Sequence, residues 1–64
     1  MKLDLKSRIK KELNELNGRL TKLQNFIKDD KFQKLNKTNQ NLLLEQQKVM
    51  QKYADILIKR IEIN

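Results

Sequence analysis

The chain has 64 residues, a formal net charge of +7, and no cysteine, histidine or proline. These counts exclude disulfides and a Cys/His metal site, and the longest apolar run, 42–44, is far too short to span a membrane. A chain this short buries only about 60% of the surface that its unfolded form exposes, so oligomerisation is the stabilising device that remains.

The first predicted element is a long helix over residues 4–28. Its apolar positions recur at steps of three and four residues, which is a helical seam and, from Ile9 onward, a heptad pattern. Asp4 is placed to cap the start of this helix. The seam consists of Leu5, Ile9, Leu13, Leu16, Leu20, Leu23 and Ile27.

A short hinge over residues 29–36 follows, and it is charged except for Phe32 and Leu35. We expect a tight connection with one short helical turn, whose two apolar side chains fold back over the end of the structure. Leu35 directly precedes the next helix, as in a hydrophobic staple. A connection this short requires the helices on either side to be antiparallel neighbours.

A second long helix is predicted over residues 37–62, with Asn36 as its N-cap and Thr38 as the alternative cap. Its main apolar stripe is interrupted by Gln47. The sequence therefore predicts an all-α fold: one domain over residues 1–64, an antiparallel helical hairpin. The stripe consists of Leu43, Met50, Ala54, Leu57 and Ile61.

The second helix also carries apolar residues on both flanks of this stripe, and its apolar arc exceeds the ~100° that one neighbouring helix covers. We interpret the surplus as contact between subunits of a homo-oligomer. The alternative is that these side chains cover Phe26, Phe32 and Leu35 within one chain. The flanking residues are Leu42, Val49, Tyr53 and Ile56 on one side, with Leu44 and Ile58 on the other.

Catalytic chemistry is poorly represented, so we predict that the chain is not an enzyme and needs no cofactor. Histidine bases and cysteine nucleophiles are absent, and Ser7 and Thr21 have no base nearby in the sequence. The acidic pair Asp29–Asp30 lies between two lysines, as in an ordinary solvated turn.

Basic residues are more informative, because arginine binds phosphates through two parallel hydrogen bonds and stacks on bases. Arg8 and Arg19 share one flank of the first helix, with Lys22 just behind, and Tyr53 and Arg60 share a face of the second. These five residues are the candidate ligand-binding residues. The alternative is structural: Arg8–Glu12 and Glu15–Arg19 ion pairs, a rim tyrosine, and a cation that complements a helix C-terminus.

Three segments carry a family resemblance: RLTKLQNFI, KFQKL and QNLLLEQQKVMQKYADILIKRI. Together they resemble the phage anti-CBASS sponge proteins and the related small helical proteins of crAss-like phages. CBASS is a bacterial defence that signals infection with cyclic oligonucleotides, and the sponges bind these messengers without degrading them. The match covers about residues 19–61.

The resemblance implies a helical homo-oligomer, a hexamer, that binds cyclic dinucleotides between protomers and, in some members, cyclic trinucleotides at a second site. It implies ligand contact at Arg19 and Lys22, and a weaker candidate contact at Arg60; Arg8 and Tyr53 come from the face argument alone. The implied location is the cytoplasm of the infected bacterial cell, with no membrane partner.

Two other functions stay open. The charge of +7 on two long helices is also typical of a protein that binds nucleic-acid backbone, although we expect nucleic acid less than a cyclic nucleotide. The other alternative is a structural coiled-coil interaction module whose charge serves solubility.

Overall fold

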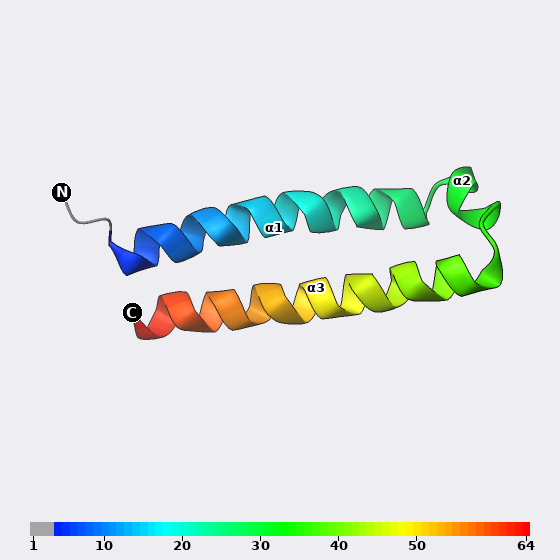
Figure 1. The fold of residues 1–64 in the computed structure, drawn as a ribbon. Coiled ribbons are helices and arrows are strands. Elements are labelled where there is room, and N and C mark those ends of the chain that lie inside the picture. The colour runs from blue at the N-terminus through cyan, green and yellow to red at the C-terminus, as the bar shows by residue number, and fades with distance from the viewer. Residues whose placement is uncertain (1–3) are drawn as a thin grey trace.

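The computed structural model describes residues 4–64, and the first three residues of the predicted 1–64 domain lie outside it. Two long helices, α1 (Leu5–Ile27) and α3 (Lys37–Ile63), run antiparallel and are joined by the single-turn helix α2 (Asp30–Gln33), as Figure 1 shows. Over the described residues every element is helical. The predicted all-α helical hairpin is confirmed.

Both long helices begin at the predicted caps. The Asp4 carboxylate accepts a hydrogen bond from the backbone N–H of Lys6 at 3.3 Å, and the Asn36 side chain accepts from that of Asn39 at 2.8 Å. Each bond satisfies one of the backbone donors that the first turn of a helix leaves without a partner. Asn36, rather than Thr38, is therefore the cap of α3.

The hinge contains the expected helical turn, and its aromatic residue folds back. Phe32 is buried, and its ring meets that of Phe26 edge to face, with centroids 6.4 Å apart and an interplanar angle of 89°. Edge-to-face packing is a favoured geometry for aromatic pairs. Phe32 thus closes the end of the hairpin, while Leu35 is half-buried beside it.

Gln40 fastens the hinge to α3. Its side-chain amide donates to the backbone carbonyls of Phe32 at 3.1 Å, Leu35 at 3.0 Å and Gln33 at 3.4 Å. A hydrophobic staple would need an apolar residue at this position, the fourth of α3. The staple predicted at Leu35 is therefore replaced by a polar clamp, in which the Gln40 amide donates to hinge carbonyls; the Phe32 carbonyl also accepts from the backbone N–H of Leu35 at 3.1 Å.

The core is a single seam between α1 and α3. Ile9, Leu16, Ala54 and Leu57 are buried, and Leu13, Met50 and Ile61 pack against them half-buried. Leu5 is 47% exposed, so the seam begins at Ile9 rather than at the predicted Leu5. Leu5 lies in the first turn of α1, at the open end of the hairpin, where only the last turn of α3 remains to cover it.

A single copy of the hairpin exposes more surface than a compact protein of its size. It measures 49 × 17 × 14 Å, and its radius of gyration of 14.9 Å exceeds the roughly 11 Å of a compact domain of this length. Its accessible surface of 5436 Å² is about 1,100 Å² above the value for a compact monomer of this mass. Part of this surface is apolar. The exposed residues of α3 include Leu42, Leu44, Val49, Ile56, Ile58 and Ile63.

Across residues 4–64, no helix combines the length and the apolar character that a membrane crossing requires.

The clamp predicts a measurable stability effect. Gln40→Ala removes the amide that serves the hinge carbonyls, and we expect the free energy of unfolding to fall by about 1–3 kcal/mol. Urea unfolding followed by circular dichroism, at one fixed chain concentration, measures this change. Asn41→Ala, at the exposed neighbouring position, is the control; equal midpoints for the two variants would contradict the clamp.

Candidate functional site

The core seam sets the register of the two helices and thereby brings Tyr53 of α3 to Glu12 of α1. The Tyr53 hydroxyl donates a hydrogen bond to Glu12 Oε1, although the two residues are 41 positions apart in the sequence. Glu12 is thus engaged across the hairpin with Tyr53, a contact beyond its predicted pairing with Arg8. Tyr53 remains 39% exposed, so one face of its ring stays open to a ligand or to another chain.

This hydrogen bond identifies the side of the hairpin on which the predicted residues lie. On α1, Arg8 and Arg19 share the flank of Glu12, and on α3, Arg60 shares the flank of Tyr53. All of them are exposed. We call this side the arginine face, defined by Arg8, Glu12, Arg19, Tyr53 and Arg60.

Charge acts on Tyr53 from two directions. The hydrogen bond to Glu12 raises the pKa of Tyr53 above its usual 10.0, and partial burial and the negative charge of Glu12 add to the rise. The positive charge of Arg60 lowers the same pKa. Tyr53, Glu12 and Arg60 therefore form one electrostatic group.

Arg19 and Lys22 form a second group. They lie one helical turn apart on α1, and both are exposed. Arg19 is two turns from Glu12, and about 16 Å along the helix axis separates it from Arg8. The two groups therefore occupy separate positions along the hairpin.

Exposed apolar side chains run along the arginine face. Leu42, Val49 and Ile56 recur at intervals of seven residues on α3 and are 57%, 62% and 46% exposed. The alternative, in which these side chains cover Phe26, Phe32 and Leu35 within one chain, does not account for this row, because all three of its residues remain exposed. The arginine face therefore combines cations, one tyrosine and an apolar row.

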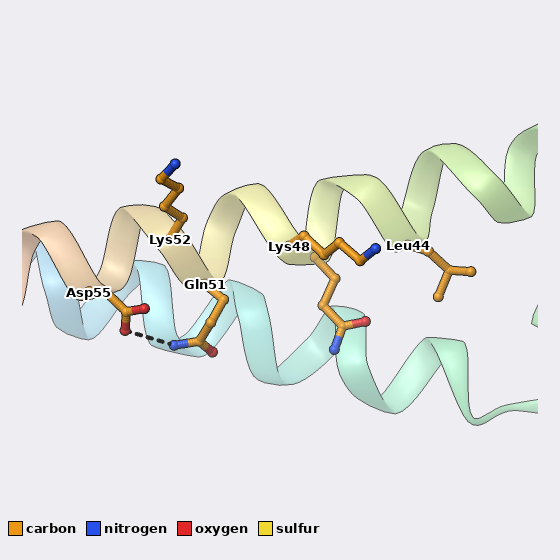
Figure 2. A pocket seen from close by; sticks show the side chains of 6 residues that line it. Leu44, Lys48, Gln51, Lys52 and Asp55 are labelled. Carbon is orange, nitrogen blue, oxygen red and sulfur yellow. Dashed lines mark hydrogen bonds between the residues drawn. The ribbon is translucent and has the colours of Figure 1, made fainter.

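A groove on the opposite flank of α3 was not predicted. It has a volume of about 510 Å³, and Figure 2 shows the side chains that line it. At about 100° per residue, these side chains lie on the side of α3 opposite to Tyr53. Its residues were visible in the sequence only as a polar flank, because a groove depends on the shapes of neighbouring side chains. We call it the α3 groove; it is lined by Leu44, Gln47, Lys48, Gln51, Lys52 and Asp55.

Metal-binding chemistry finds no support in the geometry. Among the described residues, no three carboxylate, histidine or cysteine side chains come together in a way that could hold a metal ion. Besides the Glu12 carboxylate, the exposed polar groups of the arginine face are cations and a phenol, which suit an anion or a flat ring.

The fold and its exposed cations define a small, basic protein that is all-helical over residues 4–64. The family model called Sequestin matches residues 3–63. Because the match spans nearly the whole chain, the chain belongs to the Sequestin family. No curated protein and no solved structure matches it.

The pairing of Tyr53 with Glu12 can be tested directly, because Tyr53 is the sole tyrosine and the chain has no tryptophan. Ultraviolet titration of tyrosinate should give a pKa above 10.0, which Glu12→Gln lowers and Arg60→Gln raises. The raised pKa also means that the bond stabilises the fold below pH of about 10 and that this contribution is lost as pH rises through the folded-state pKa. A wild-type titration at or below 10.0, unchanged by Glu12→Gln, would contradict the pairing.

Proposed function

We propose that the chain sequesters a nucleotide messenger: it binds the cyclic di- or oligonucleotides of bacterial CBASS defence and holds them without cleaving them. The observation that carries the proposal is the Sequestin match over residues 3–63, since the name describes a protein that sequesters. The finer identity of the messenger rests on the resemblance of the RLTKLQNFI and QKYADILIKRI segments to anti-CBASS sponges. In this role the chain is a phage immune-evasion protein in the cytoplasm of the infected cell.

Phosphate recognition is assigned to the cations of the arginine face. Arg19 and Lys22 are the first candidates, because they match the family motif and lie one turn apart, where two cations can approach one phosphate. Tyr53 supplies a flat surface for a base, and its hydroxyl is held by Glu12. Arg60, beside Tyr53, and Arg8 are the second candidates.

A complete site requires more than one copy of the chain. Arg8 and Arg19 are about 16 Å apart along α1, and we expect a cyclic dinucleotide, with two phosphates on one small ring, to be held by the same cationic group from two copies. The exposed row of Leu42, Val49 and Ile56 provides apolar surface for the contact. We propose a homo-oligomer, and the resemblance favours a hexamer.

The side chains of this chain favour binding of the messenger without cleavage. The chain has no histidine to act as a base and no cysteine to act as a nucleophile. We therefore expect the bound messenger to be recovered intact when the protein is unfolded.

Nucleic-acid backbone is the second candidate ligand, favoured by the net charge of +7. A ligand screen separates the two. Isothermal titration calorimetry identifies which class of ligand binds. The ligands to test are cyclic dinucleotides, cyclic trinucleotides, a cyclic nucleotide with a pyrophosphate bridge, and arbitrary DNA and RNA duplexes. Heating the complex to release the ligand, followed by mass spectrometry, shows whether the released ligand is chemically unchanged.

Tight, salt-tolerant binding of one cyclic nucleotide and its recovery unaltered are the expected results. Binding of duplexes alone, falling steeply with added salt, would replace the proposal with the nucleic-acid function. Binding of neither class, or release of a cleaved nucleotide, would remove it.

Lys22→Ala tests the assigned residues. It removes one charge-assisted hydrogen bond, so we expect affinity for the cyclic nucleotide to fall about tenfold or more, with helical content and assembly unchanged. Lys10→Ala is the matched control, because Lys10 is an equally exposed lysine on the other flank of α1. Equal affinities for the two variants would exclude Lys22 from the site.

A further inference from the structure

The α3 groove lies on the flank of α3 that the proposed function leaves unused. Its lining residues all come from one helix, with Leu44 at one end and Asp55 at the other (Figure 2). Gln47 is half-buried in it, and Gln51 donates a hydrogen bond to Asp55 at 3.2 Å. A groove lined by a single helix is open along its length, so a single copy provides only one of its walls.

An apolar row with a polar centre follows the groove. Leu44, Gln51 and Ile58 recur at intervals of seven residues and therefore lie on one side of α3. Leu44 is 38% exposed and Ile58 43% exposed, on either side of the central amide. Beside this row are Lys48, before the centre, and Asp55, after it.

These residues are arranged so that the surface is complementary to itself. When two α3 helices lie antiparallel and cross at Gln51, Leu44 of each copy meets Ile58 of the other. Lys48 of each copy then meets Asp55 of the other, and the two Gln51 amides meet on the two-fold axis. Such reciprocal contacts, in which one residue meets a second and the second meets the first, define a two-fold interface between identical chains.

We propose that the α3 groove is the interface with a second copy of this chain, packed antiparallel about Gln51. Charge complementarity favours this arrangement, because both Lys48–Asp55 contacts of the antiparallel pair join opposite charges.

In this proposal the two flanks of α3 bind different partners. The arginine face binds the messenger, and the α3 groove contacts the second copy of the chain. The inference rests on the proposed function only in expecting that copies meet. Its test contains no messenger, so loss of messenger binding and loss of this interface are separate results.

Disulfide trapping tests the geometry, because the chain has no cysteine of its own. Under mild oxidation we expect Gln51→Cys to form covalent dimers rapidly. The control Lys59→Cys should not, because an antiparallel pair that crosses at Gln51 holds the two copies of position 59 about 24 Å apart along the helices. Leu44→Cys mixed with Ile58→Cys should give the mixed dimer in preference to either homodimer. Trapping of Gln51→Cys no faster than Lys59→Cys, or a preference for homodimers in the mixture, would overturn the proposal.

Charge reversal tests the complementarity, with the trapping rate of Gln51→Cys as the readout of this interface alone. Lys48→Glu and Asp55→Lys should each slow trapping about tenfold, and the two together should restore it to within about threefold of the parent. Lys48 and Asp55 are about 10 Å apart along their own helix, so restoration comes from contacts between copies. A double variant that traps more slowly than either single variant would overturn the pairing.

Discussion

The whole structure depends on one imbalance: α3 is apolar on three sides, and α1 covers only one of them. Ile9, Leu16, Ala54 and Leu57 close the seam between the helices, while Val49 on one flank and Ile58 on the other stay exposed. A hairpin of two helices has no third element to bring against these flanks. The elongated shape and the excess surface of a single copy have the same cause. Identical copies of the chain are the simplest cover for the apolar surface that remains, and this is the basis on which we propose a homo-oligomer.

The same seam positions the candidate site. Because it fixes the register of α1 and α3, the Tyr53 hydroxyl reaches Glu12, and Arg60 comes close enough to act on the charge of Tyr53. Arg19 and Lys22 are carried on the same helix as Glu12 but two or more turns away. A single chain thus displays two separate cationic groups and closes neither, which is the expected geometry if copies of the chain must combine to enclose a small anionic ligand.

Features that depend on local sequence were predictable. The seam from Ile9 onward follows from its spacing, the caps at Asp4 and Asn36 from residue type and position, and the folding back of Phe32 from an apolar residue in a charged hinge. Periodicity and capping act over one or two turns, so one sequence is enough to read them.

Features that depend on how the two helices pack against each other could not be predicted from the sequence. Sequence spacing placed Glu12 beside Arg8, four residues away, because the register that brings Tyr53 to it is a property of the packed pair. The role of Gln40 depends on the position of the hinge carbonyls, which the sequence does not give. The α3 groove depends on the conformations of the side chains around Gln51. Exposure of Leu5 likewise depends on where α3 ends. The five candidate ligand residues could be nominated from sequence, but their division into two groups could not.

The central claim is that one hairpin is an incomplete unit of structure, and sedimentation equilibrium over a range of concentrations, paired with circular dichroism, tests it most directly. The account predicts a mass that is a multiple of the 7.7 kDa chain at micromolar concentration, with helical content falling as dilution separates the copies. A fully helical species that stays at the mass of a single chain at every concentration would contradict it.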